Sequence, residues 1–201
     1  LLKNPEIIIQ SLSNYEKQKE AQQNEANRQK IIDNKDRIYN LKNNLYEGNT
    51  SASKVMVEFF DYNCSYCKRA HADLKKVINK RQDVKVIYKN FPILSENSLK
   101  LAKYAVVISE INNDKFVNFH NKVINHKGRI EDNKLNEILS DLDIDVDKIN
   151  GEVKKTRVDE KIKADVELAN ILGLRGTPAF IIGEELIFGY INYDEIISKL
   201  D

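Results

Sequence analysis

The chain has 201 residues, of which 41% are hydrophobic and 31% are charged, and its 32 Lys and Arg residues nearly balance its 31 Asp and Glu residues. That balance argues against a nucleic-acid-binding protein, because such proteins bind mainly through an excess of positive charge. No apolar run approaches the roughly 18 residues that span a bilayer, so we expect no membrane span, and the length suits one ordinary domain with an appendage.

The first 44 residues form a polar stretch with one Pro and no Gly. Asn4-Pro5-Glu6 predicts a helix start, with a capping Asn, Pro in the first turn and an acid that suits the helix dipole. Apolar residues then follow at helical spacing, at Ile8, Leu12 and Tyr15. So narrow a stripe fits two interpretations: a solvated arm on the domain surface, or a helix that associates with copies of itself.

Residues 48–51, Gly-Asn-Thr-Ser, predict a linker. We therefore expect a helical stalk and linker over residues 1–48 and a domain over residues 49–201. Within the domain, the β-rich runs Lys54–Phe60 and Val84–Lys89 predict two strands, and the residues from Cys64 onward follow a helical period. This order predicts a βαβ unit with Cys64 at the turn from strand to helix.

The stretch from residue 95 to residue 172 has helical periodicity almost throughout, and Gly173 predicts the end of its last helix. Two short strands should follow at Ala179–Ile182 and Leu186–Phe188, and a final helix at Tyr193–Leu200. The C-terminal half is therefore expected to consist of a helical block followed by a β-hairpin and a helix.

The chain has only two cysteines, separated by two residues as Cys64-Ser65-Tyr66-Cys67. Two thiols cannot complete a four-ligand structural zinc site, and a bridge between them would close only a tiny loop, so a redox pair or a soft-metal site remains. A helix N-terminus lowers the pKa of a thiol, because its free N–H groups stabilise negative sulfur. Cys64 is therefore the expected nucleophile, and Cys67 is the expected resolving thiol.

A second feature is Gly176-Thr177-Pro178, which directly precedes a predicted strand. Proline is the residue that allows a cis peptide bond at low cost. A cis Thr177-Pro178 bond would set the Thr177 backbone opposite the CxxC helix, where it could pair with an extended substrate peptide. Thr177 and Pro178, with Ser65 and Tyr66, are therefore the predicted substrate-binding residues.

These two motifs resemble those of the DsbA-like branch of the thioredoxin superfamily, at residues 55–68 and 173–183 above all. The helical block, about 93–172, is similar to that branch's helical insertion. The first eight residues and the polar helix after them resemble the suppressor-of-copper-sensitivity protein C subgroup. The resemblance implies an α/β thioredoxin fold with a helical insertion, preceded by an N-terminal helical stalk that forms trimers, and a disulfide isomerase or reductase of the periplasm.

The dipeptide Ser65-Tyr66 departs from the family pattern, which often has Pro or Gly first. Tyr66 stands where strongly oxidising relatives have His, so the resemblance implies a less oxidising site. Glu58 precedes Cys64 by six residues, as an acid does in family members, and is a candidate proton shuttle for Cys67. Lys89 could neutralise Glu58 or face water.

The three histidines are expected on the surface, at His71, His120 and His126. No cofactor is indicated. The start at Leu1 has neither an initiator Met nor an apolar signal core, so we expect a mature chain whose secretory signal lies upstream.

The leading hypothesis is a periplasmic thiol–disulfide oxidoreductase that isomerises or reduces misbridged secreted proteins and is kept reduced by a membrane thiol reductase. One alternative is a DsbA-type oxidase recharged by a quinone-linked membrane partner. Another is a protein that binds Cu(I) through the two thiolates, because soft sulfur prefers that ion.

Overall fold

A computed structural model describes residues 5–201. Asn4, the predicted helix cap, lies outside these residues. A five-stranded sheet with the order β1-β3-β2-β4-β5 forms the centre of the domain. Its strands are β1 (Leu45–Gly48), β2 (Lys54–Phe60), β3 (Val84–Asn90), β4 (Ala179–Ile182) and β5 (Glu185–Phe188). Only β2 and β3 are parallel, and the other neighbouring strands pair antiparallel.

Helices surround this sheet: α1 (Pro5–Asp33), α2 (Lys35–Tyr39), α3 (Ser65–Lys80), α4 (Glu96–Ile111), α5 (Asn113–Ile124), α6 (Asp132–Asp141), α7 (Val146–Glu152), α8 (Thr156–Leu172) and α9 (Tyr193–Leu200), with a 3-10 turn η1 (Leu41–Asn43). Helices α4 to α8 form the helical insertion. The predicted α/β thioredoxin fold with a helical insertion is confirmed, and the structure also has the long N-terminal helix. Gly173 ends α8 in the left-handed conformation, as its position predicted.

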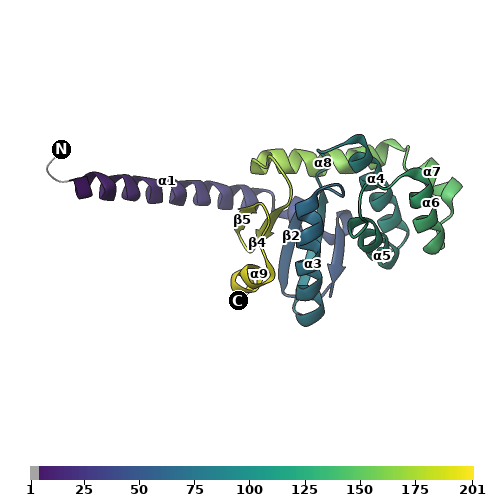
Figure 1. Ribbon diagram of the computed structural model, residues 1–201, viewed down its shortest axis with the longest axis horizontal. Helices are drawn as coiled ribbons and strands as arrows, with labels where there is room; N and C mark the ends of the chain where they lie inside the picture. Colours follow the sequence, from purple (N-terminus) through teal and green to yellow (C-terminus); the bar gives the residue numbers. More distant parts are fainter. Residues whose placement is uncertain (1–4) are drawn as a thin grey trace.

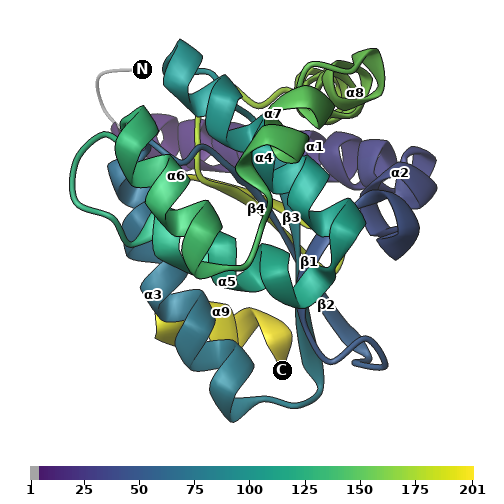
Figure 2. The ribbon, with the colours of Figure 1, turned by 90° about the vertical axis from the view of Figure 1, so that its right-hand side faces the viewer.

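Side chains on β2 alternate between the two faces of the sheet, and each face has its own core. Met56 and Phe60 belong to the larger core, which α3, the insertion helices and α9 complete, whereas Val57 and Phe59 belong to the smaller one, covered by α8 and the end of α1. Figure 2 shows the sheet between these two groups of helices. Because both faces are covered, β2 is almost wholly buried.

Helix α1 projects from the domain as a long arm (Figure 1). Most of its length is exposed, and only Asn27 and Ile31 near its end are buried. There Arg28 forms an ion pair with Glu184, at 2.5 Å between Nε and Oε2, in the turn between β4 and β5. The C-terminal part of α1 therefore belongs to the domain, and Ala21 and Asn24 also line a pocket with Leu186 of β5.

Residues before the predicted boundary at residue 48 take part in the sheet. Residues Leu45–Gly48 form the edge strand β1, which pairs antiparallel with β3, and Ile38 of α2 is fully buried in the smaller core. Residues 49–51 make the turn between β1 and β2, in which Asn49 accepts the backbone N–H of Ala52 at 2.9 Å. The segment predicted as stalk and linker thus supplies backbone hydrogen bonds and apolar contacts to the sheet, and the domain boundary itself stays a prediction.

Gly48 occupies a position that other residues would strain. Its φ is +101°, and a Cβ there would lie 2.9 Å from the carbonyl oxygen of Val84. Gly48→Ala should lower the free energy of unfolding by about 1–3 kcal/mol. The matched control is Gly151→Ala in α7, where a Cβ meets nothing within 4 Å; it should be neutral or slightly stabilising. Urea unfolding of both variants checks this, and equal effects would contradict it.

Candidate active site

The two cysteines lie at the start of α3, directly after the central strand. Cys64 is the N-cap residue, and its Sγ accepts the backbone N–H of Cys67 at 3.3 Å. Both thiols are free. Cys64 retains 7% of its surface exposed and Cys67 none. An incoming sulfur can therefore reach Cys64 but not Cys67 without a rearrangement.

The surroundings shift the pKa values of the two thiols in opposite directions. The pKa of Cys64 is lowered to about 6, first by a hydrogen bond from the Cys67 side chain and then, against the cost of burial, by Thr177 and the N–H groups of Cys67 and Tyr66. The pKa of Cys67 is raised far above its usual value, first by burial, then by its hydrogen bond to Cys64 and by the charge of Glu58. At neutral pH the pair is one thiolate and one thiol, as exchange requires.

The loop before β4 completes the site from a distant part of the chain. The Thr177-Pro178 bond is cis, and the Sγ of Cys64 lies 3.3 Å from the carbonyl oxygen of Thr177. The contact follows from the topology, because β4 pairs with β2 through Phe59 and Ala179. Pro178 is buried, whereas Thr177 is partly exposed. Substrate binding at this loop stays a prediction.

The turn between β2 and α3 is held by side chains that the sequence analysis did not single out. Asp61 is 1% exposed, and its carboxylate accepts the N–H groups of Asn63 at 2.8 Å and Leu94 at 3.0 Å. The Asn63 amide donates to Ser98 Oγ at 2.9 Å, which ties the turn to α4. Asp and Asn in a short turn commonly bind nearby backbone N–H groups, so the signal was present in the sequence.

Exposed residues border the thiol. Tyr66 is 58% exposed at the helix start, and the adjacent loop presents Ile93 and Leu94, at 44% and 55%. Ser65 is also exposed. Apolar side chains beside a reactive thiol can contact a polypeptide substrate.

Glu58 is buried beneath the pair, at 2% exposure on β2, and its Oε1 has no hydrogen-bond partner among the described residues. Burial raises its pKa well above the usual value, and the negative charge of Cys64 raises it further. Glu58 is therefore placed to hold a proton near Cys67, and its role as a proton shuttle stays a prediction.

Lys89 takes neither of the two places expected for it. It is 3% exposed, and its ammonium group pairs with Asp165 of α8 at 3.3 Å and donates to the carbonyl oxygen of Arg37 at 2.6 Å. The register explains this, because Glu58 stands opposite Tyr88 on β3, whereas Lys89 stands opposite Phe59. Neighbouring residues on a strand point to opposite faces, so Lys89 reaches the other core.

Two of the three histidines are buried rather than on the surface. His71 and His120 are each 1% exposed, with ring centroids 5.0 Å apart. His120 Nδ1 lies 3.1 Å from the Tyr62 hydroxyl, and His71 Nε2 lies 2.8 Å from Asn121 Oδ1. Their polar partners are spread over several elements, which the sequence order does not bring together. His126 is partly exposed.

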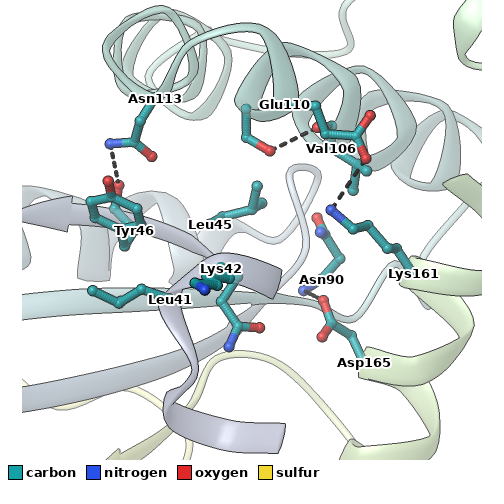
Figure 3. Close-up of a pocket in the computed structure, with 12 residues that line it drawn as sticks. Leu41, Lys42, Leu45, Tyr46, Asn90, Val106, Glu110, Asn113, Lys161 and Asp165 are labelled. Atoms are coloured by element: carbon teal, nitrogen blue, oxygen red, sulfur yellow. Dashed lines mark hydrogen bonds and ion pairs between the residues drawn. The ribbon is translucent and has the colours of Figure 1, made fainter.

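A small polar cavity of about 150 Å³ lies beside the Lys89–Asp165 pair (Figure 3). Asn90 and Asp165 line it from one side, and the backbone N–H of Asn90 donates to Asp165 at 2.9 Å. Lys161 pairs with Glu110 across it, at 3.2 Å. Neither cysteine lines this cavity, so it is separate from the thiol site.

Within residues 5–201, no group of three or more His, Cys, Asp or Glu side chains is placed to hold a metal ion. Over the same part of the chain, no helix is long and apolar enough to cross a bilayer.

The fold and site define a thioredoxin-like thiol–disulfide oxidoreductase, with a CxxC pair at a helix start and a cis-proline loop beside it. The model of the DSBA-like thioredoxin domain matches residues 55–201, so the chain belongs to this family.

The solved structures that are similar to it include a thiol–disulfide exchange protein. The chain is 33% identical to alpha-DsbA2 from Wolbachia pipientis, with a TM-score of 0.82 over 90% of this chain and 97% of that one. It is 26% identical to the catalytic domain of ScsC from Proteus mirabilis, with a TM-score of 0.78 over 86% and 96%.

Two curated relatives differ in how much of them the chain covers. Disulfide bond formation protein D of Bacillus subtilis is 26% identical, and the match covers 77% of this chain and 74% of that protein. Na(+)/H(+) antiporter NhaA 1 of Salinispora arenicola is 22% identical over 76% of this chain, but the chain spans only 24% of its length.

The acidity of Cys64 can be tested through its rate of alkylation. A lowered pKa keeps the thiolate above about pH 6 and loses it as the pH falls through that value. Alkylation of the reduced protein by iodoacetamide should therefore rise with a midpoint near pH 6 and level off by about pH 8. Cys64→Ala should abolish this phase. A midpoint near the usual value of a free thiol would contradict the assignment.

Proposed function

We propose that the protein is a disulfide isomerase and reductase that acts on misbridged secreted proteins in the periplasm. The observation that carries the proposal is the exposed arm α1, which extends from a domain with a reactive dithiol (Figure 1). An arm that joins several copies would hold their sites apart around one substrate. Such an arrangement suits the rearrangement of wrong disulfides more than simple oxidation.

The exchange would begin with attack by the Cys64 thiolate on a substrate disulfide. One substrate sulfur then bonds to Cys64, and the other leaves as a thiolate. In isomerisation that thiolate, or another one in the substrate, attacks the mixed disulfide and releases Cys64. In reduction, Cys67 attacks Cys64 Sγ instead, the substrate leaves reduced, and a membrane thiol reductase restores the dithiol.

Glu58 would take the proton that Cys67 loses in the reductive step. Burial raises the pKa of Glu58, and the charge of the Cys64 thiolate raises it further. The mixed disulfide removes the second effect, so the pKa of Glu58 falls, and a Glu58 carboxyl that has lost its proton to solvent can accept one from Cys67. The proton affinity of Glu58 would thus follow the state of Cys64.

The Thr177-Pro178 loop would bind the substrate backbone, with Ser65 and Tyr66 as contacts on the other side of Cys64. The backbone of this loop lies beside the attacking sulfur, because the Thr177 carbonyl oxygen is 3.3 Å from Cys64 Sγ. A substrate held there in extended form would present its sulfur to Cys64.

The arm would form a homotrimer. Its apolar side chains are exposed in the single chain, with Ile8 at 41%, Leu12 at 57% and Tyr15 at 63%. These residues lie at spacings of four and three and therefore share one helix face. A helix that leaves such a stripe in water gains stability by pairing it with copies of itself.

The second candidate is a dithiol oxidase recharged by a quinone-linked membrane partner. The lowered pKa of Cys64 favours it, because a stable thiolate makes the reduced form more stable and the disulfide more oxidising. Cu(I) binding by both sulfurs is less favoured, since a metal needs two thiolates and burial raises the pKa of Cys67.

The role of the arm can be tested by Ile8→Asp with Leu12→Asp, which puts two negative charges into the stripe without touching the domain. The double variant should become monomeric by sedimentation, lose most of its rescue of scrambled ribonuclease and keep its rate with a small disulfide. Glu20→Gln, also exposed on α1, is the matched control. A double variant that keeps both its mass and its rescue activity would contradict the proposal.

The role of Glu58 can be tested by Glu58→Gln, which keeps the shape of the protonated side chain. Formation of the mixed disulfide should stay within about twofold, whereas its resolution by Cys67 should slow by about tenfold or more. Stopped-flow measurements with a quenched disulfide peptide separate the two steps. Equal slowing of both steps would indicate a structural effect instead.

A further inference from the structure

Positive side chains lie around Cys64, although the chain as a whole has a net charge of only +1. Lys68 and Arg69 follow the cysteine pair on the first turns of α3, and Arg175 precedes Thr177 by two residues. We refer to these three residues as the basic rim. The charge is therefore local to the site and does not reflect the composition of the protein.

Two members of the basic rim are held in place by uncharged partners. The Lys68 ammonium donates to the backbone carbonyl of His126 at 2.6 Å. The Arg69 guanidinium lies over the ring of Tyr190, 4.5 Å from its centroid. A carbonyl and an aromatic ring position a cation without neutralising it, so both charges remain available to a ligand.

The nearest carboxylate to Arg69 on its own helix is already occupied. Asp73 accepts the Tyr190 hydroxyl at 2.7 Å and pairs with Lys76 at 3.1 Å. Arg175 is exposed on the loop that reaches Cys64. Two acids also lie on neighbouring loops: Glu131, which pairs with Arg129 at 3.2 Å, and Glu96, which is exposed at the start of α4. The rim cations and Arg129 outnumber these two exposed acids, and the Asp61 carboxylate in the turn before Cys64 is buried and bonded to backbone N–H groups.

A backbone hydrogen bond relates the rim to the cis-proline loop. Gly189 donates its N–H to the carbonyl oxygen of Pro178 at 2.9 Å, so the segment that carries Tyr190 borders this loop, and Arg69 of α3 lies over the Tyr190 ring. An extended peptide advances about 3.3 Å per residue. Side chains two or three residues from the reacting cysteine would thus lie about 7–10 Å from it, within reach of Arg69 or Arg175.

We infer that the basic rim selects polypeptide substrates that carry Asp or Glu within two or three residues of the reacting cysteine. This specificity rests on the proposed exchange at Cys64. In that step the Cys64 thiolate bonds to the cysteine sulfur of a peptide disulfide, and the other sulfur leaves as a thiolate. Acidic neighbours attract the peptide to a positive surface, which raises the rate of encounter. This increase becomes smaller as the salt concentration rises.

The test uses the full-length protein and three disulfide peptides that differ only in whether Glu, Gln or Lys flanks the cysteine. In 20 mM salt the Glu peptide should react about tenfold faster than the Lys peptide, and the ratio should fall below about threefold in 0.5 M salt. Arg69→Gln with Arg175→Gln should reduce the low-salt ratio to about threefold or less. Lys163→Gln, an exposed lysine on α8, is the matched control and should leave the ratio unchanged.

Two results would overturn the inference: a ratio near one for the original protein in low salt, or a tenfold ratio that persists in the double variant. Failure of the proposed exchange itself would look different, since the uncharged peptide would then also fail to react. The rate with hydroxyethyl disulfide, which carries no charge, shows whether each variant is folded and has a reactive thiol.

Discussion

The contact between Cys64 and Thr177 joins segments 113 residues apart and depends on the rest of the fold. It requires β4 to pair with β2, and it requires α3 to begin one residue after Cys64. The same arrangement exposes Cys64 slightly and encloses Cys67. This arrangement shifts the pKa values of two chemically identical side chains in opposite directions, because the Cys64 sulfur accepts hydrogen bonds from the Cys67 thiol and from backbone N–H groups, whereas burial disfavours a charge on Cys67.

The two faces of the sheet carry different parts of the molecule. The face that carries Glu58 holds the cysteines, the buried histidines and most of the core. The opposite face carries the Lys89–Asp165 pair, which joins β3 to α8, and it receives the end of α1. The arm is thus anchored behind the sheet, away from the thiols, so copies joined by their arms would leave their sites open. This separation supports the proposed isomerase activity.

Much of the fold could be predicted from the sequence, since long periodic segments and strong breakers are local signals. The strands Lys54–Phe60 and Ala179–Ile182 have the predicted bounds, β5 begins one residue earlier than expected, and Gly173 ends its helix as predicted. The strand β1 could not be predicted, because it has only four residues and gains its stability from pairing with β3. Its pairing partner is distant in sequence and is fixed only by the complete sheet.

In the site, as in the fold, some features depend on neighbouring residues in the chain and others on residues distant in the sequence. The cysteines and Thr177-Pro178 were recognisable from their own neighbours in the chain, whereas the burial of His120 and the partner of Lys89 depend on elements that meet only after folding. Asp61 and Asn63 hold the turn before Cys64; their residue types indicate a turn, but their partners Leu94 and Ser98 come close only after folding.

The central claim, that Cys64 attacks and Cys67 resolves, is tested most directly by trapping the mixed disulfide. Cys67→Ser and Cys64→Ser are each incubated with a disulfide peptide, and the adducts are located by mass spectrometry. The account predicts a stable adduct on Cys64 in the Cys67→Ser variant and almost none on Cys67 in the Cys64→Ser variant. An equal or larger adduct on Cys67 would contradict it.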